Sequence, residues 1–327
     1  MTDWQGRRVL VTGVYGFLAS HLVAELLARG VEVIGLYRDR PAESYLQRTG
    51  LDEQVTLVPG DITDLDACRR IINEHEAEVV FHLAAQALVG LANRSPYSTL
   101  ESNIRGTYTL LEACRELHGP GLVQAVVVAS SDKAYGDQPE LPYREEAPLL
   151  GMHPYDASKS CADLLARMFA QTYGLPVAVT RCANLYGPGD PSPSRIVPGT
   201  MLSLLKGERP IIRSDGSPQR DYLFVGDAVQ AYLMLAEAVA EGRAVGRAYN
   251  FGSGVPVSVL ELVCQIVAVS GVDLPPEVQN TARGEIAHQY LDVRRAAEEL
   301  GWRAATPLPE GLQATYTWYE RAYDRDL

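Results

Sequence analysis

The sequence predicts an α/β fold, in which a doubly wound parallel sheet is joined to a smaller C-terminal lobe. Apolar strand candidates alternate with amphipathic helix patterns, which is typical of a parallel sheet covered by helices on both faces. The strand candidates are Arg7 to Gly13, Val31 to Tyr37, Gln54 to Gly60, Glu78 to Ala84, Leu122 to Ser131 and Pro176 to Ala183. A glycine-rich turn directly after the first candidate indicates a Rossmann-type sheet.

The C-terminal lobe is predicted from a change in this rhythm after the last strand candidate. The proline- and glycine-rich stretch 187–193 indicates loops at the start of a different unit. We therefore expect a Rossmann domain over residues 1–183 and a second lobe over 184–327. Residues 249–254 indicate another strand and turn at the large sheet, so the segment 220–255 is expected to return to the first domain.

The glycine-rich turn runs from Thr12 to Ala19 and reads Thr-Gly-Val-Tyr-Gly-Phe-Leu-Ala. Gly13 and Gly16 carry no side chain that would block a close approach of the backbone to an anion. A helix N-terminus behind such a turn directs free N–H groups at a pyrophosphate, so the turn predicts a bound dinucleotide. The residues expected to contact the dinucleotide here are Gly13, Tyr15, Gly16, Phe17 and Leu18.

Tyr155 and Lys159 are spaced by four residues. On a helix this spacing puts both side chains on one face, where the ammonium group of Lys159 can lower the pKa of the Tyr155 phenol. Tyr155 would then be a usable general base. The alternative is an ordinary surface pair on an amphipathic helix. The glycine turn in the same Rossmann-like frame favours the catalytic interpretation.

Further short motifs follow one another along the chain. They are Gly60-Asp61-Ile62, His82-Leu83-Ala84-Ala85, Asn103 in Asn-Ile-Arg-Gly-Thr, Ser130-Ser131, Asn184-Leu185-Tyr186-Gly187-Pro188 and Arg220-Asp221-Tyr222. With the glycine turn and the Tyr155-x-x-x-Lys159 pair, they resemble the extended short-chain dehydrogenase/reductase family, specifically its nucleotide-sugar epimerases and dehydratases. The resemblance covers nearly the whole chain and implies that the lobe over 184–327 binds a nucleotide sugar. One departure is Ala19, where the family usually has a third glycine, and its methyl group is expected to shift the helix slightly.

The resemblance implies NAD or NADP as the cofactor. Further residues are expected to contact the cofactor, namely Asp61, Ile62, Leu83, Ala84, Ala85, Tyr155 and Lys159. Asp61 and Ile62 are expected to lie beside the adenine. Relatives that prefer NAD usually have an aspartate at the end of the second strand, whereas here that carboxylate is missing and Arg38 follows. An arginine there can bind a 2′-phosphate, so the sequence favours NADP. The alternative is that Arg38 and Arg40 are solvated and that Asp39 reaches the ribose.

The resemblance also implies the chemistry. Tyr155 would take the proton of the hydroxyl at sugar carbon 4 while hydride passes to the cofactor, and Lys159 would keep Tyr155 in its reactive form. Ser131, at the carboxyl end of a strand candidate, would donate a hydrogen bond to the developing ketone. The alternative for Ser131 is a hydroxyl that caps the following turn.

Asp132 and Lys133 directly follow Ser131, where simple 4-epimerases of the family commonly have small or apolar residues. A 4-keto sugar has an acidic hydrogen at carbon 5, and losing it with the carbon 6 hydroxyl requires a base beside an acid. Hexose 4,6-dehydratases generally use Asp-Glu here. Some relatives, including CDP-glucose dehydratases and the inverting UDP-N-acetylglucosamine dehydratases, resemble this chain in having Asp-Lys. Lys133 would have to lose its proton near neutral pH, which burial or the nicotinamide charge would favour. The alternative is a pair that only holds the loop or contacts sugar hydroxyls.

The sequence therefore predicts an enzyme that transiently oxidises carbon 4 of a nucleotide sugar, with an NDP-hexose 4,6-dehydratase as the main interpretation. A 4-epimerase or a uronate decarboxylase would need only Ser131, Tyr155 and Lys159, and stays an alternative. A non-catalytic dinucleotide-binding protein is a more remote one, because a fold does not dictate a function.

Four residues are candidates for binding the substrate. Asn184 matches the family asparagine that contacts the substrate diphosphate. Planar guanidinium groups, which can donate two hydrogen bonds to one phosphate, are offered by Arg195, Arg220 and Arg283. Each arginine alone is as compatible with an ordinary surface charge. No metal site is expected, because His82 has no partner at ligand spacing and is assigned to a loop on the cofactor side.

Composition limits the remaining possibilities. The 327 residues carry a net charge of −12, which disfavours nucleic acid as a partner. The sequence has no apolar run of about 18 residues and no basic leader followed by an apolar stretch, so no membrane span is expected and a cytoplasmic location is predicted. The resemblance implies a homodimer, formed by the helix that carries Tyr155 and a helix over about 96–117.

Overall fold

The structure is a computed structural model that describes residues 4–41, 43–119, 121–282 and 286–326. The strands of its large sheet are β1 (Arg8–Thr12), β2 (Glu32–Tyr37), β3 (Thr56–Pro59), β4 (Val79–His82), β5 (Ala125–Ala129), β6 (Val177–Cys182) and β10 (Ala248–Phe251). All neighbouring pairs are parallel, in the order β10-β6-β5-β4-β1-β2-β3. The chain winds from the adjacent strands β1 and β4 outward to both edges, which confirms the predicted doubly wound Rossmann-type sheet.

Six of these strands lie inside the ranges that the apolar patterns predict. β4 and β6 are buried along their whole length, and β1 and β5 almost so. Valine and alanine dominate β5 and β6, as is typical of strands that are covered by helices on both faces. β10, which pairs with β6, forms one edge of the sheet.

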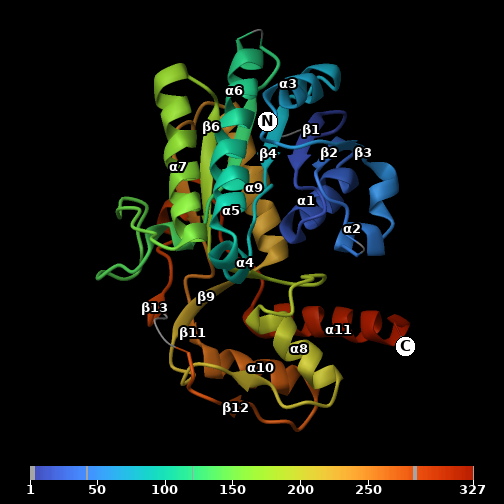
Figure 1. The fold of residues 1–327 in the computed structure, drawn as a ribbon, viewed down its shortest axis with the longest axis vertical. Helices are drawn as coiled ribbons and strands as arrows, with labels where there is room; N and C mark the ends of the chain where they lie inside the picture. Colours follow the sequence, from blue (N-terminus) through green and yellow to red (C-terminus); the bar gives the residue numbers. More distant parts are fainter. Residues whose placement is uncertain (1–3, 42, 120, 283–285, 327) are drawn as a thin grey trace.

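Helices cover both faces of the large sheet (Figure 1). On one face lie α1 (Phe17–Ala28) and α9 (Val225–Ala240). On the opposite face lie α3 (Leu65–Glu74), α6 (Gly106–His118) and α7 (Pro154–Tyr173). The neighbouring strand residues Val80 and Phe81 point to opposite faces and belong to two separate apolar cores. None of the helices within the described residues is long and apolar enough to cross a membrane.

The helix expected over about 96–117 is present over residues 96–118, with a π-helical turn in its middle. It consists of α5 (Pro96–Leu100), a π-helical turn η2 (Glu101–Arg105) and α6. Within this wider turn, Asn103 accepts a hydrogen bond from the backbone N–H of Gln86 at 2.7 Å and donates one to Ser158 Oγ at 2.9 Å. Such turns frequently occur at functional sites. Here the turn ties α7 to the loop that follows β4.

A smaller lobe lies below the large sheet in Figure 1. Its elements are β7 (Asn184–Tyr186), α8 (Ile196–Leu205), β8 (Ile211–Ile212), β9 (Gln219–Phe224), β11 (Pro256–Ser258), α10 (Val259–Ser270), β12 (Glu277–Val278), β13 (His288–Gln289) and α11 (Leu308–Asp326). β9 is the central strand of a small sheet and pairs with β7, β11 and β13. The helices pack in a core of their own, to which Tyr186, Leu262 and Leu312 belong.

The two units interleave along the chain. After β9, which belongs to the small sheet, α9 returns to pack against β5 and β6. β10 then joins the large sheet beside β6, and the chain crosses back to the small sheet at β11. The Rossmann unit therefore includes α9 and β10, which lie within the segment 220–255.

Candidate active site

A cavity of about 1530 Å³ opens at the carboxyl ends of the large sheet, where it is bordered by α8 and β9 of the small lobe. Ligands of open parallel sheets bind at this edge. The predicted site residues that line the cavity are Gly13, Tyr15, Gly16, Phe17, Leu18, Arg38, Asp61, Ile62, Leu83, Ala84, Ala85, Ser131, Asp132, Lys133, Tyr155, Lys159, Asn184, Arg195 and Arg220. Arg283 lies outside the described residues.

The N-terminus of α1 borders the cavity and has no side-chain cap. Gly13 has a φ of +68°, and a Cβ atom on it would lie 2.7 Å from Cα of Ala84. Gly16 is the N-cap and offers no side-chain acceptor to the first N–H groups of α1. Ala19, which stands where the family usually has a third glycine, is buried in α1. These features fit the pyrophosphate of a dinucleotide, which needs a close backbone and free N–H groups.

A cation and an anion lie side by side just after β2. The Arg38 guanidinium donates to Asp39 Oδ2 at 2.8 Å and to Ser102 Oγ at 3.3 Å. Arg40 pairs with Asp52 at 3.2 Å, and Arg38, Asp39 and Arg40 all line the cavity. A phosphate bound by Arg38 would therefore compete with the carboxylate of Asp39.

His82 differs from its predicted place in a loop, because it is the last residue of β4 and is buried. Its Nδ1 lies 2.9 Å from Thr12 Oγ1 and its Nε2 lies 2.9 Å from Thr107 Oγ1. Burial, with a smaller contribution from the charge of Lys159, lowers the pKa of His82 to about 3. The ring is therefore neutral and joins β1, β4 and α6 behind the cavity wall.

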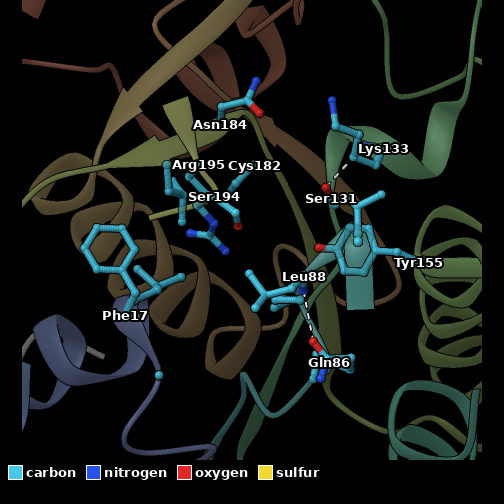
Figure 2. Close-up of a pocket in the computed structure, with 18 of the residues that line it drawn as sticks. Phe17, Gln86, Leu88, Ser131, Lys133, Tyr155, Cys182, Asn184, Ser194 and Arg195 are labelled. Atoms are coloured by element: carbon cyan, nitrogen blue, oxygen red, sulfur yellow. Dashed lines mark hydrogen bonds between the residues drawn. The ribbon is translucent and has the colours of Figure 1, made fainter. Parts of the chain in front are cut away.

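Ser131 and Tyr155 meet in the cavity. Ser131 follows β5 and caps η3 (Asp132–Tyr135), where its Oγ accepts from Lys133 N at 3.2 Å and donates to Asp132 Oδ1 at 3.0 Å. In Figure 2, Ser131, Lys133 and Tyr155 lie on one side of the cavity and Phe17 on the other. Burial raises the pKa of Tyr155 to about 12, and a hydrogen bond with Ser131 opposes this rise.

Lys159 lies on α7 one turn after Tyr155, as the spacing predicts, but its ammonium group has another partner. Nζ donates to the backbone carbonyl of Ala129 at 2.7 Å and lies 5.9 Å from the centre of the Tyr155 ring. Burial lowers the pKa of Lys159 to about 8. The expected lowering of the Tyr155 pKa by Lys159 is therefore not found, because burial of the phenol outweighs the charges around it.

Asp132 and Lys133 also border the cavity, and a residue that the sequence does not single out holds them. Asp132 is buried, and its Oδ2 has no hydrogen-bond partner among the described residues. Gln289 of β13 donates from Nε2 to the backbone carbonyl of Asp132 at 3.0 Å and accepts a hydrogen bond from Lys133 Nζ. No local motif marks Gln289, because its contacts with η3 arise only when the small lobe folds against the large sheet.

The substrate candidates within the described residues come from the small lobe. Asn184 donates to the backbone carbonyl of Asp221 at 3.2 Å. Arg195 pairs with Asp190 at 3.2 Å, and Figure 2 shows its guanidinium reaching into the cavity. The Arg220 guanidinium donates to the backbone carbonyl of the preceding residue, Gln219, at 2.8 Å. These contacts leave side-chain donors that can turn to a phosphate.

Asp221, in the Arg-Asp-Tyr motif, has a structural role. It is wholly buried, and its carboxylate accepts from Ser253 N at 2.8 Å, Ser253 Oγ at 2.6 Å and Gly254 N at 3.1 Å. These bonds fasten β9 to the turn after β10. The motif therefore fixes the place of its neighbour Arg220 relative to the large sheet.

The fold and the site together define a dinucleotide-dependent enzyme of the short-chain dehydrogenase/reductase type. Residues 9–252 match the family described as NAD dependent epimerase/dehydratase family. The chain belongs to this family, and the predicted resemblance is confirmed.

Three relatives illustrate what the chain is similar to. It is 32% identical over 332 residues to a CDP-glucose 4,6-dehydratase of Salmonella typhimurium, covering 97% of this chain and 91% of the relative. It is 35% identical over 316 residues to a UDP-glucose 4-epimerase of Mycolicibacterium smegmatis, covering 95% and 98%. The crystal structure of DesIV, a dTDP-glucose 4,6-dehydratase of Streptomyces venezuelae with NAD and TYD bound, is 30% identical, with a TM-score of 0.87 and coverage of 97% and 98%. Overall similarity therefore does not distinguish a dehydratase from an epimerase. The distinction has to come from the side chains that line the cavity.

Proposed function

We propose that the protein is an NDP-hexose 4,6-dehydratase. The observation that carries this proposal is the pair Asp132 and Lys133, which borders the same cavity as Ser131 and Tyr155. Asp132 brings a buried carboxyl oxygen without a partner among the described residues, and Lys133 brings an amine. A reaction that stops at oxidation and reduction of carbon 4 needs neither group, whereas loss of water from carbons 5 and 6 needs both an acid and a base.

The first step uses Tyr155, Ser131 and Lys159. A dinucleotide held by the glycine turn would supply the hydride acceptor for carbon 4 and, once reduced, the hydride donor for carbon 6. Tyr155 takes the proton of the carbon 4 hydroxyl, and Ser131 donates a hydrogen bond to the oxygen as it becomes a ketone. Lys159 donates a hydrogen bond to the carbonyl of Ala129. When it is protonated, its positive charge lies near the Tyr155 ring and favours the ionised phenol.

The second step uses the acid and the base. Lys133, in its neutral form, takes the proton from carbon 5, which the 4-ketone makes acidic. Asp132, in its protonated form, gives a proton to the carbon 6 hydroxyl, which leaves as water as the double bond between carbons 5 and 6 forms. Lys133 then returns its proton to carbon 5, and with the hydride that the reduced dinucleotide would supply at carbon 6 this gives a 4-keto-6-deoxy sugar. Passing the proton taken up by Tyr155 to Asp132 restores both groups, so the net change is the loss of one water.

The small lobe is proposed to bind the nucleotide diphosphate. Asn184, Arg195 and Arg220 line the cavity on the side of this lobe, and their side chains can donate to phosphate oxygens. Arg283 stays a candidate from the sequence alone.

A preference for NADP over NAD, a homodimer and a cytoplasmic location stay proposals from the sequence. NADP is supported by Arg38, a cation at the end of β2 where no carboxylate ends the strand. Apolar side chains on the surface of α5, α6 and α7 are compatible with a dimer through these helices. They include Tyr97, Leu100, Tyr108, Leu164 and Met168.

The function is tested by incubating the purified enzyme, with NAD or NADP, with UDP-, CDP-, GDP- and dTDP-hexoses and with UDP-glucuronate. Mass spectrometry of the products is the readout. A product lighter by one water supports the dehydratase. Asp132→Asn and Lys133→Met should then abolish water loss while still allowing reduction of the cofactor.

A 4-epimerase is the second candidate, favoured by the 35% identity to a UDP-glucose 4-epimerase. It would use only Ser131, Tyr155 and Lys159. A product of unchanged mass that separates from its substrate would decide for it, and loss of carbon dioxide from UDP-glucuronate would indicate a decarboxylase. In either case Asp132 and Lys133 would be left with a structural or substrate-contacting role.

A further inference from the structure

Gln289 is wholly buried, yet its amide makes two contacts with the segment that carries the acid and the base. It comes from β13 of the small sheet, where its Cα is paired with that of Arg220 on β9. Its Nε2 donates to the backbone carbonyl of Asp132 at 3.0 Å, and its Oε1 accepts from Lys133 Nζ. The same side chain therefore fixes the backbone at one catalytic candidate and the amine of the next.

The chemistry of an amide suits the second contact. Its oxygen can accept a hydrogen bond from an ammonium or a neutral amine without adding a negative charge. A carboxylate in that place would form an ion pair with the ammonium and hold the proton on Nζ. A lysine that must give up its proton to act as a base is better held by a neutral acceptor.

Other charged groups also face this corner of the cavity. Asp132 lies next to Lys133 on η3, and Asp156 lies on α7, where it is buried and lines the cavity. Burial raises the pKa of Asp156, and the charge of Lys133 opposes this rise. The Asp156 carboxyl group therefore already interacts with the charge of Lys133, and a carboxylate at position 289 would add an ion pair to the ammonium.

We propose that Gln289 is a positioning residue for the elimination step, which holds Lys133 toward the cavity as a neutral acceptor and couples its placement to the β9–β13 ladder that carries Arg220. This inference rests on the proposed dehydratase function. The placement of Lys133 is thereby linked to that of Arg220, because Gln289 and Arg220 are partners on the two paired strands.

The test separates the two half-reactions in Gln289→Glu, with wild type and Lys133→Met beside it. Single-turnover absorbance of the reduced nicotinamide reports oxidation at carbon 4. Deuterium uptake at carbon 5 from heavy water and mass loss report elimination. We expect Gln289→Glu to reduce the cofactor within about twofold of the wild-type rate, but to slow both elimination readouts about 100-fold, the contribution of a general base. Reduced cofactor should accumulate.

A double variant shows whether Gln289 acts through Lys133. In Lys133→Met, adding Gln289→Glu should change the elimination rate no further, because the interaction is already gone. Gln124→Glu, which adds a carboxylate beside Arg7 at the other end of β5, is the matched control and should leave both half-reactions unchanged. Gln289→Met, which keeps the length but loses both hydrogen bonds, should slow elimination more than oxidation.

The outcomes distinguish this inference from the function beneath it. If wild type removes water but Gln289→Glu eliminates at the wild-type rate, or if both half-reactions slow equally, the positioning role is overturned and the dehydratase stands. If wild type gives only isomers of unchanged mass, both the function and this role are overturned. Additive losses in the double variant would also overturn the role, since Gln289 would then act on something other than Lys133.

Discussion

Lys159 lies one helical turn after Tyr155 on α7, yet its ammonium group donates to the carbonyl of Ala129 at 2.7 Å and stays 5.9 Å from the centre of the tyrosine ring. Burial lowers the pKa of Lys159 to about 8 and raises that of Tyr155 to about 12. Both groups are therefore driven toward their neutral forms. The positive charge of an oxidised nicotinamide beside the phenol would favour its ionised form.

Replacing Lys159 by methionine should make the protein more stable at neutral pH. The pKa of Lys159 is about 8 when folded and about 10.4 in an unfolded chain, so the folded state binds fewer protons between these values and stability rises with pH across this window. Below pH 8 the lysine carries its full burial cost. The variant also loses the hydrogen bond to Ala129. We therefore expect its free energy of unfolding to be about 1–2 kcal/mol higher than that of the wild type at pH 7, and this difference should shrink toward pH 10. Urea unfolding at both pH values measures it.

The same variant should lose about 100-fold in kcat, because the charge that supports Tyr155 is removed. Lys206→Met replaces an exposed lysine after α8 and should leave both stability and activity unchanged. A Lys159→Met enzyme that is more stable but fully active would contradict the catalytic role of Lys159. A Lys159→Met variant that is less stable than the wild type at pH 7 would show that the buried ammonium group of Lys159 does not destabilise the fold.

Gly13→Ala should abolish tight binding of the dinucleotide. A Cβ atom at Gly13 would lie 2.7 Å from Cα of Ala84, and φ there is +68°, so both sterics and backbone strain oppose the substitution. Gly50→Ala is the control, since Gly50 has a φ of +69° but open space around its Cβ position. Calorimetry should show at least about a tenfold weaker Kd for Gly13→Ala and no change for Gly50→Ala, whose stability falls by about 1 kcal/mol. Equal effects of both would mean that strain alone decides.

The elements of the large sheet could be predicted from the sequence because their signals are local. The apolar run of β5 causes the strand to form and can be read directly from the chain. Gly13 belongs to a turn whose hydrogen-bonded ends, Gly13 and Gly16, are three residues apart. The Tyr155-Lys159 spacing likewise needs only the period of a helix. Motifs of this kind also carry the family resemblance.

Other features depend on contacts between distant segments and could not be predicted. Gln289 reaches Lys133 across 156 residues, and this contact exists only because β13 pairs with β9. The π-helical turn before α6 contains Asn103, whose contact with the backbone of Gln86 forms only in the folded loop. The i, i+4 spacing reveals that Lys159 is a neighbour of Tyr155, and it therefore predicts a lowered pKa for the phenol. The spacing does not reveal the burial of Tyr155, which is the largest influence on its pKa and raises it.

Arg38→Ala tests the preference for NADP. If Arg38 holds a 2′-phosphate, the variant should bind NADP about tenfold more weakly, since charge-assisted hydrogen bonds of this kind contribute about 1.5–3 kcal/mol, and should bind NAD no less tightly. Asp39→Asn should move the ratio in the opposite direction by freeing the Arg38 guanidinium from its carboxylate partner. Fluorescence titration with NADH and NADPH gives both constants. A wild-type enzyme that favours NADH, and loses this preference in Asp39→Asn, would show that Asp39 reads the ribose instead.

Asp163 and Arg181 should be the costliest ion pair to break. Both side chains are wholly buried between α7 and β6, with Arg181 Nε 2.7 Å from Asp163 Oδ2, and Arg181 also donates to the Tyr135 hydroxyl at 2.8 Å. Asp163→Asn leaves a buried guanidinium without its counter-charge, and we expect a loss of about 3–5 kcal/mol in the free energy of unfolding. Urea denaturation followed by circular dichroism measures it.

Two further variants show whether the loss comes from the unpaired charge. Removing both charges in Asp163→Leu with Arg181→Met should recover a large part of the stability, because apolar side chains of similar volume carry no desolvation cost. Asp66→Asn, which breaks an exposed pair with Arg69, should cost less than about 1 kcal/mol. If Asp163→Asn costs no more than Asp66→Asn, water must reach the buried guanidinium. A double variant as unstable as Asp163→Asn would instead place the stabilisation in the bonds of Arg181 to Tyr135 and the neighbouring loop.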